Sequence, residues 1–196
     1  MHKKFWVMII CILVFSLSFF SICFARDTEK SLLKEIGLFT GYANGDLIDK
    51  DDYCLILTIV RLGFDLKPFL NKFNFNPPGL VEFEFEPFAN TLISPDPNAE
   101  IGFNLLLKYG LPLTQRLYPY LEGGVGFVYT TQHTLEQSTQ YNFIPQAGAG
   151  IIYFLKKDSL AVTAGYRYRH LSNASIKAPN KGINVDMALV GLSLFY

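Results

Sequence analysis

The sequence predicts an all-β fold: an eight-stranded antiparallel transmembrane β-barrel of the outer-membrane type, which follows a cleaved signal peptide. Half of the 196 residues are apolar and 15% are aromatic, yet no apolar run after residue 25 is long enough for a membrane helix. Apolar residues instead alternate with polar ones, with a period of two, in eight segments. Most segments are about 10 to 13 residues long, which suits strands that cross a bilayer.

The chain begins with the layout of a secretory signal. Two lysines precede an uncharged apolar run, residues 5–24, which ends beside the small residue Ala25. Such a signal has a basic start, an apolar middle and small residues at the cleavage site. We therefore expect residues 1–25 to be a signal peptide and residues 26–196 to be the outer-membrane barrel domain. An uncleaved anchor helix is the alternative, because the apolar run is nearly long enough to span a bilayer.

The composition after residue 25 excludes several classes of protein. Cleavage removes Cys11 and Cys23 and leaves Cys54 alone, so we expect no internal disulfide and no cysteine metal cluster. Lys3 and Lys4 also leave, so 15 basic residues face 17 acidic ones, and nucleic acid is not an expected partner. The remaining His residues are isolated in the sequence, so no metal and no other cofactor is predicted.

The eight segments follow one another with turn-forming residues between them. Connections such as Asn76-Pro77-Pro78-Gly79 combine the residues that favour turns. The segments are residues 34–43, 53–66, 79–89, 99–110, 116–129, 143–155, 159–170 and 184–196.

The alternation allows two architectures. In a soluble sandwich or a lipocalin-type barrel, the apolar face of each strand points inward. In an outer-membrane barrel the apolar face meets lipid, and the charged residues fill an interior just wide enough for side chains. Opposite charges can then pair inside the barrel. The residues that we expect to do so are Glu82, Glu84, Glu86, Glu122, Arg61, Lys108, Arg167 and Arg169.

Aromatic residues near the segment ends favour the membrane barrel, because tyrosines form a girdle at membrane interfaces. The candidate girdle residues are Tyr42, Tyr53, Tyr109, Tyr118, Tyr120, Tyr129, Tyr153, Tyr168 and Tyr196. The last segment alternates from Ala188 onward and ends on Tyr196, which resembles the terminal strand of outer-membrane barrels. In those barrels the final aromatic belongs to the assembly signal, so we expect the barrel-assembly machinery as a partner and the outer membrane of a Gram-negative cell as the location.

One pair of residues in the seventh segment suggests chemistry. His170 and Ser172 share a face of an extended strand, because alternate side chains point the same way. They continue the apolar, lipid-facing set. If the N-terminus lies in the periplasm, this strand ends at the outer leaflet, and the returning strand brings Asn184 and then Asp186 close. These residues suit a nucleophile, a general base and an orienting group.

The same region resembles a known family. His170-Leu171-Ser172-Asn173-Ala174 and Pro179-Asn180-Lys181-Gly182-Ile183 resemble the signature of the outer-membrane lipid A 3-O-deacylases, the PagL family. The resemblance implies an esterase that removes the 3-O-linked hydroxyacyl chain from lipid A in the outer leaflet. It also implies that Ser172 is the nucleophile and His170 the base. The expected partners are lipid A or lipopolysaccharide as substrate and the surrounding outer-membrane lipids, and a homodimer is left open.

The sequence departs from the family at one position. The family's third catalytic residue is Glu, and Asn184 stands there in this chain. An amide can fix the imidazole tautomer, but it cannot stabilise an imidazolium by charge. We rank Asn184 first and Asp186 second as the third member, and Asn173 and Asn180 match the motif as candidates for oxyanion or substrate binding. The alternative function is a structural or lipid-binding barrel that has lost catalysis with its Glu.

Overall fold

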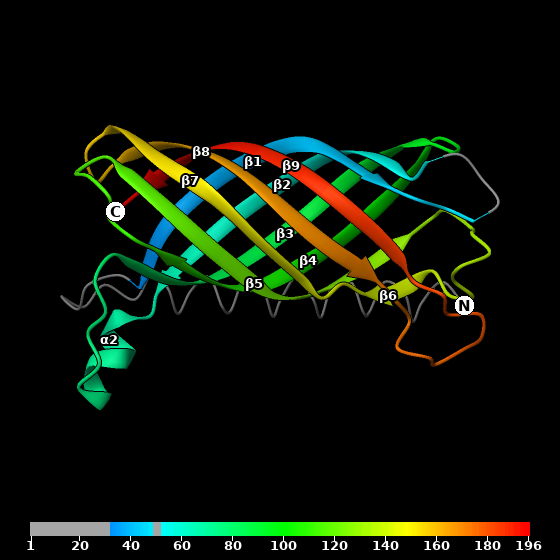
Figure 1. Cartoon of the computed structure of the whole chain (residues 1–196), viewed down its shortest axis with the longest axis horizontal. Helices are drawn as coiled ribbons and strands as arrows, with labels where there is room; N and C mark the ends of the chain where they lie inside the picture. The colour runs from blue at the N-terminus through cyan, green and yellow to red at the C-terminus, as the bar shows by residue number, and fades with distance from the viewer. Residues whose placement is uncertain (1–31, 49–51) are drawn as a thin grey trace, which may run out of the picture. The chain divides into compact units, whose positions relative to one another are not determined.

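The computed structural model describes residues 32–48 and 52–196, so the predicted signal peptide lies outside the described residues. Within the described residues the strands form one antiparallel sheet that closes on itself through the β1–β9 and β4–β5 pairs (Figure 1). The predicted eight-stranded barrel is confirmed. Its elements are β1 (Leu33–Gly45), β2 (Cys54–Asp65), α2 (Lys67–Leu70), η1 (Asn71–Phe73), β3 (Leu80–Ser94), β4 (Asn98–Gly110), β5 (Leu117–Thr130), β6 (Tyr141–Phe143), β7 (Gln146–Lys156), β8 (Leu160–Leu171) and β9 (Ile183–Phe195).

Strands β6 and β7 together form the predicted segment 143–155. Both pair with β5 in one register, since Phe127 lies opposite Phe143 and Gly124 lies opposite Gln146. The short break between them contains Pro145, which has no backbone N–H to donate to a ladder. The two strands therefore count as one of the eight barrel strands.

The described connections lie at two ends of the barrel. Residues 66–79, 111–116 and 157–159 lie at the end where β1 begins and β9 finishes, and α2 and η1 belong to the first of these connections. The connections before β2, β4, β6 and β9 lie at the other end (Figure 1). Among the described residues, no helix has the length and apolar character needed to span a bilayer.

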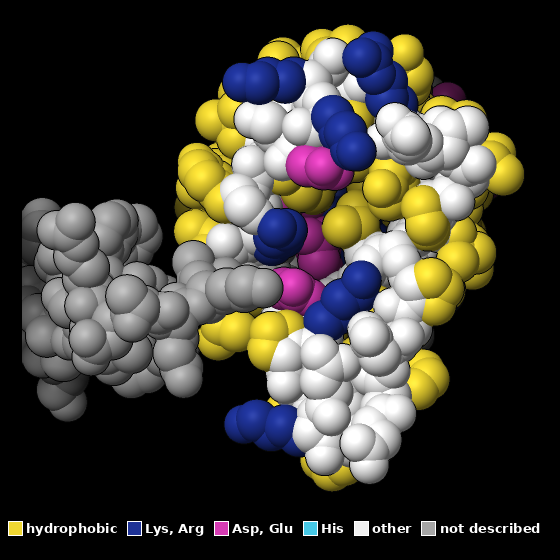
Figure 2. Space-filling model, turned by 90° about the vertical axis from the view of Figure 1, so that its left-hand side faces the viewer, with side chains coloured by type: hydrophobic (Ala, Val, Ile, Leu, Met, Phe, Trp, Pro, Cys, Tyr) yellow, Lys and Arg dark blue, Asp and Glu magenta, His cyan; other side chains and the backbone are white. Residues whose placement is uncertain are grey.

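The outward face of the barrel is apolar. Leu38, Leu121 and Leu192 are exposed, and each belongs to the alternate set that the sequence assigns to lipid. The flanks of the barrel are accordingly covered by hydrophobic side chains, whereas carboxylates are visible inside its opening (Figure 2). This inverted pattern suits a barrel that is surrounded by lipid.

The interior contains the predicted ion pairs. Arg61 lies 2.8 Å from Glu86 and 3.1 Å from Glu122, and Arg167 lies 2.7 Å from each of these two carboxylates. All four side chains are buried. A guanidinium that bridges two carboxylates fixes the separation of the strands that present them, because planar forks bind carboxylates in defined geometry.

A second ionic cluster lies beside the first. The Lys108 ammonium group contacts Glu35, and it lies 2.6 Å from Glu82 and 2.8 Å from Glu84. Glu35 joins the predicted set from β1. The Glu-rich strand β3 thus meets cations from three other strands, as the sequence predicts.

Apolar side chains fill the remaining interior, and the sequence did not reveal them. A large cluster lies toward the end where β8 finishes, and a smaller one lies at the other end. The larger cluster includes Phe39, Leu55, Leu57, Ile59, Phe88, Leu92, Val128, Ile144, Leu171, Ile183, Val185, Met187 and Leu189. The smaller consists of Tyr120, Ile152, Phe154, Ala161 and Phe195.

Three of the predicted girdle tyrosines point inward instead. Tyr53 is 1% exposed and donates a hydrogen bond of 2.7 Å to Glu100, and Tyr120 is 4% exposed. Tyr118 packs on the buried Phe154 ring with centroids 5.2 Å apart. Their assignment to the girdle is wrong, because nearness to a strand end does not decide which face a side chain occupies. The predicted girdle tyrosines that are exposed are Tyr42, Tyr153, Tyr168 and Tyr196.

Replacing Arg167 by methionine tests the role of the buried ion pairs. The change leaves the Glu86 and Glu122 carboxylates without one of their cations, and breaking a buried pair in this way costs about 3–5 kcal/mol. We expect the free energy of unfolding to fall by this amount, measured by urea unfolding in detergent with heat-modifiable gel migration as the signal. Arg116→Met, at an exposed position between strands, is the control, and equal stability of the two variants contradicts this role.

Candidate active site

The end of β8 presents two polar side chains on the outward face. His170 and Ser172 are half-buried, and the residues between and around them, Arg169, Leu171 and Asn173, are buried. The chain stays extended beyond β8 because Ser172 exchanges two backbone hydrogen bonds with β6, of 2.7 and 3.0 Å. The strand geometry therefore keeps the imidazole and the hydroxyl on one face, as the sequence predicts.

The imidazole of His170 bonds to Asn184. The two residues lie opposite each other in the β8–β9 ladder, and His170 Nδ1 lies 2.7 Å from Asn184 Oδ1. An amide oxygen only accepts hydrogen bonds, so Nδ1 carries a proton, and in the neutral tautomer of this ring the lone pair lies on Nε2. Asn184 thus occupies the orienting position that the sequence ranks first.

Asp186 lies elsewhere on the same face. It pairs in register with Tyr168, and its carboxylate accepts a hydrogen bond from the Tyr166 hydroxyl. Within the described residues, His170 bonds to Asn184 and not to this carboxylate. The structure therefore does not bring the second-ranked residue to the imidazole.

Asn180 holds the Ser172 hydroxyl. The Asn180 side-chain oxygen and nitrogen each lie 3.2 Å from Ser172 Oγ, and the backbone N–H of Ala174 also donates to this oxygen at 3.2 Å. In the described part of the chain, the hydroxyl bonds to these groups rather than to His170. Catalytic hydrogen bonds are often unformed without substrate, and a rotation about χ1 redirects a hydroxyl.

The side chain of Asn173 points away from the face that Ser172 occupies. Its side chain is buried, and its Nδ2 donates to the backbone oxygen of Lys177 at 2.8 Å and to Ser138 Oγ at 3.2 Å. Its backbone N–H donates to Asn180 Oδ1 at 2.9 Å. The structure thus uses Asn173 to hold the loop and does not bring its side chain to the serine hydroxyl.

A tight turn follows the serine. Ala174 and Ser175 have φ values of 53° and 61°, and Ile176 N–H donates to the Asn173 oxygen at 3.1 Å. Residues other than Gly adopt this left-handed region at a cost, and such strain gathers at functional sites. The turn aims the Ala174 N–H at Ser172 Oγ. This backbone donor has no side-chain signal in the sequence.

Gly182 packs against the imidazole. It has a φ of 76°, and a Cβ atom at this position would lie 2.7 Å from His170 Nε2 and would also meet Cε1. Any larger residue would push the ring out of its place. The sequence marks Gly182 only as part of the motif, because its contact with His170 depends on the strand register.

A second loop supports the first. Residues 131–140 lie beside residues 172–182 at the same end of the barrel (Figure 1). Ser138 N–H donates to the Pro179 oxygen at 3.0 Å, and Lys181 N–H donates to the Glu136 oxygen at 2.9 Å. The part that this loop plays in holding the site is a finding of the structure.

A metal site is not apparent near these residues. Among the described residues, the carboxylates of Glu35, Glu82 and Glu84 are close enough together to hold an ion. The Lys108 ammonium group already lies among them. The three carboxylates and Lys108 therefore form an ion-pair cluster in the barrel interior, away from His170 at the end of β8.

The geometry of the site agrees with a family comparison. The model of the family described as lipid A 3-O-deacylase (PagL) matches residues 60–193. The chain belongs to this family. The match covers both parts of the signature around His170 and Gly182, and it confirms the resemblance that the sequence shows. A comparison with curated protein sequences finds no match.

Solved structures show the same fold as this PagL-family chain. The crystal structure of the outer membrane enzyme PagL is 17% identical, covers 80% of this chain and 97% of its own, and has a TM-score of 0.59. Neisserial surface protein A is 10% identical, covers 83% of this chain and 96% of its own, and has a TM-score of 0.60. The chain is accordingly an outer-membrane barrel.

Replacing Gly182 by alanine tests the packing behind His170. The new methyl group displaces the imidazole, and a shift of about 1 Å in a catalytic group costs on the order of 10²-fold in rate. We expect this loss in an assay of lipid A deacylation with the purified barrel. Gly123→Ala is the matched control, because its Cβ would meet nothing closer than 3.6 Å. Equal rates for both variants contradict a constraint by Gly182.

Proposed function

We propose that this chain is an esterase that removes the 3-O-linked hydroxyacyl chain from lipid A in the outer leaflet, with Ser172 as nucleophile and His170 as base. The observation that carries the proposal is the 2.7 Å contact between His170 Nδ1 and Asn184, on the same outward face as Ser172. Membership of the lipid A deacylase family supports hydrolysis of this substrate class. The proposed residues explain how the chain performs it.

The reaction follows from the free lone pair on His170 Nε2. Ser172 Oγ attacks the ester carbonyl as Nε2 takes its proton, while Asn184 holds Nδ1–H. The tetrahedral intermediate then breaks its bond to the sugar oxygen, which receives the proton from Nε2. A water molecule, activated by the same nitrogen, releases the hydroxyacyl chain from Ser172 as a free acid.

Two donors suit the oxyanion of the tetrahedral intermediate. Ala174 N–H and Asn180 Nδ2 both lie 3.2 Å from Ser172 Oγ, so they surround the atom that attacks. When Ser172 Oγ turns toward His170, both donors are released for a developing negative charge nearby. Such preorganised donors contribute about 3–4 kcal/mol each to transition-state stabilisation.

The surroundings of Ser172 suit an acyl chain. Phe143 bridges directly to Ser172, and Phe143, Tyr141 and Tyr168 are exposed on the same outward face. Aromatic side chains at this level belong at a membrane interface. If the N-terminus lies in the periplasm, the ester of lipid A reaches Ser172 from within the outer leaflet, without leaving the membrane.

The alternative is a structural or lipid-binding barrel without turnover. Asn184 favours it, since an amide does not supply the charge that stabilises an imidazolium. The 2.7 Å contact with His170 favours the esterase. The assembly machinery and a homodimer stay predictions for either function.

Mass spectrometry of lipid A tests the esterase directly. Cells that express the native chain should contain lipid A that lacks one ester-linked hydroxyacyl group, and cells that express Ser172→Ala should contain unmodified lipid A. Ser159→Ala, at the opposite end of the barrel, controls for loss of a hydroxyl and should retain the activity. If cells that express the native chain contain unmodified lipid A although the barrel is folded in the outer membrane, this result supports the alternative function.

Exchanging Asn184 for glutamate tests the orienting group. A carboxylate at this position stabilises the imidazolium in the transition state, because replacing such a charge by an amide in a serine triad lowers the rate steeply. We expect the deacylation rate to rise on the order of tenfold or more. Asp186→Asn, one outward position away, should leave the rate unchanged. A loss of activity in Asp186→Asn would instead assign the orienting role to that carboxylate.

A further inference from the structure

The connection between β2 and β3 differs from the other two at its end of the barrel. Residues 66–79 are longer than residues 111–116 and 157–159, and they contain α2 and η1. This segment projects from the barrel beside its outer wall (Figure 1). A short turn would suffice to join two adjacent antiparallel strands, so the extra chain requires another explanation.

The segment exposes three aromatic rings. Phe69, Phe73 and Phe75 are 57%, 68% and 58% exposed, and the Phe69 and Phe73 rings contact each other with centroids 5.2 Å apart. Aromatic surface of this size is unfavourable in water, and contiguous exposed apolar patches mark contacts with a membrane or a partner.

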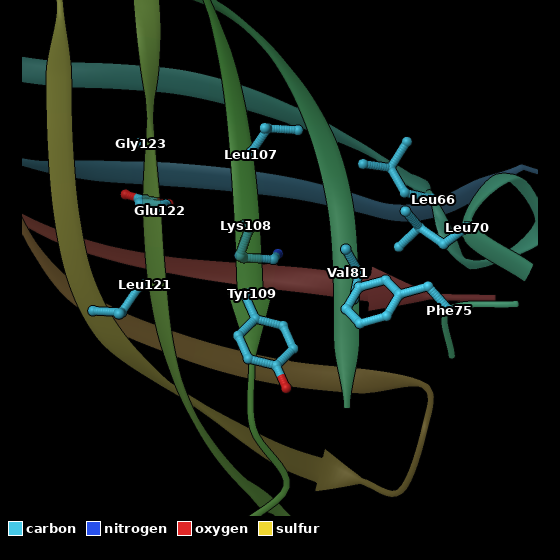
Figure 3. A pocket seen from close by; sticks show the side chains of 10 residues that line it. All are labelled: Leu66, Leu70, Phe75, Val81, Leu107, Lys108, Tyr109, Leu121, Glu122 and Gly123. Atoms are coloured by element: carbon cyan, nitrogen blue, oxygen red, sulfur yellow. The ribbon is translucent and has the colours of Figure 1, made fainter. Parts of the chain in front are cut away.

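A hollow separates the segment from the barrel wall. It has a volume of about 480 Å³ and is open to the outside. Leu66, Leu70 and Phe75 line it from the segment (Figure 3). Strands β3, β4 and β5 line its other side with the outward side chains of Val81, Leu107, Tyr109 and Leu121, and with Lys108, Glu122 and Gly123 between them. Leu107 and Leu121 are exposed residues of the barrel's outward face, so the hollow opens onto the apolar face of the barrel.

Basic side chains surround the same end of the barrel. Lys67 and Lys72 belong to the segment itself, and Lys and Arg side chains lie around the barrel opening (Figure 2). The other described basic residues at this end are Lys34, Arg116, Lys156 and Lys157, whereas Asp65 and Asp158 are acidic residues in the same turns. Lysines beside an apolar anchor attract anionic lipid headgroups, each with its stem along the apolar surface.

We propose that residues 66–79 bind phospholipid of the leaflet opposite to the one that holds lipid A. Phe69 and Phe73 insert among the acyl chains, one chain occupies the hollow against β3, β4 and β5, and Lys67 and Lys72 lie at the headgroup phosphates. The segment then fixes the depth of the barrel in the membrane. This binding is independent of the proposed esterase.

Tryptophan fluorescence tests the insertion. The sequence contains one tryptophan, Trp6, so Phe73→Trp in a Trp6→Phe chain gives a single reporter. The full chain is reconstituted in vesicles of phosphatidylethanolamine and phosphatidylglycerol that contain phosphatidylcholine with brominated acyl chains. We expect emission at shorter wavelength than that of a His133→Trp control at the other end, with quenching by bromine and little quenching by aqueous acrylamide.

The lysines are tested in the same system. Replacing phosphatidylglycerol by unbrominated phosphatidylcholine should reduce the quenching by bromine, and adding Lys67→Gln with Lys72→Gln should remove this dependence on anionic lipid. Emission like that of His133→Trp, quenched by acrylamide, overturns the proposal. Heat-modifiable migration verifies folding, and Phe69→Trp replaces Phe73→Trp if that variant does not fold. None of these measurements depends on deacylation.

Discussion

The buried ion pairs between Arg61, Arg167, Glu86 and Glu122 are the constraint on which the rest of the structure depends. A barrel of eight strands is too narrow for an aqueous channel, so its interior must be filled by side chains that satisfy one another. Charges that are paired inside leave the outward face free to be apolar, as a bilayer requires. Along every strand, one alternate set of residues must therefore face the interior and the other must face lipid. The place of a polar residue in this alternation decides on which face its side chain lies.

The candidate site is an exception to the apolar character of the outward face. His170, Ser172 and Asn184 are polar residues at outward positions. Polar groups on this face are tolerated at the end of the strands, where interfacial water and headgroups replace hydrocarbon. The loops supply the remaining partners, since Asn180 bonds to the serine and residues 131–140 hold residues 172–182. The barrel wall thus fixes the face on which the site lies, and the two packed loops fix the position of the Ser172 hydroxyl.

Different parts of this structure follow from the sequence to different degrees. The strands and the Glu–Arg pairs follow from period and length, and the His170–Asn184 pair follows from antiparallel register. Tyr53 and Tyr120 stand near strand ends but point inward, because the alternation along the strand, and not the distance from its end, decides the face of a side chain. The interior apolar clusters do not follow from the sequence, because an apolar residue such as Leu55 or Val185 suits the interior and the lipid-facing side of a strand equally well. The Ala174 turn and the Gly182 contact could not be predicted, since each depends on backbone that is fixed by distant residues.

The third position of the site shows how the membrane limits the chemistry. A carboxylate on the lipid-facing wall must have a partner, and Asp186 has one in the Tyr166 hydroxyl. Asn184 is neutral, so the side chain that contacts His170 adds no charge to this face. In the mechanism that we propose, the same neutrality withdraws support from the imidazolium that forms as Ser172 attacks. Asn184 therefore lowers the cost of holding the site in a lipid environment and weakens the stabilisation of the charged transition state. For the esterase that we propose, this arrangement predicts slow turnover and a stable unliganded site.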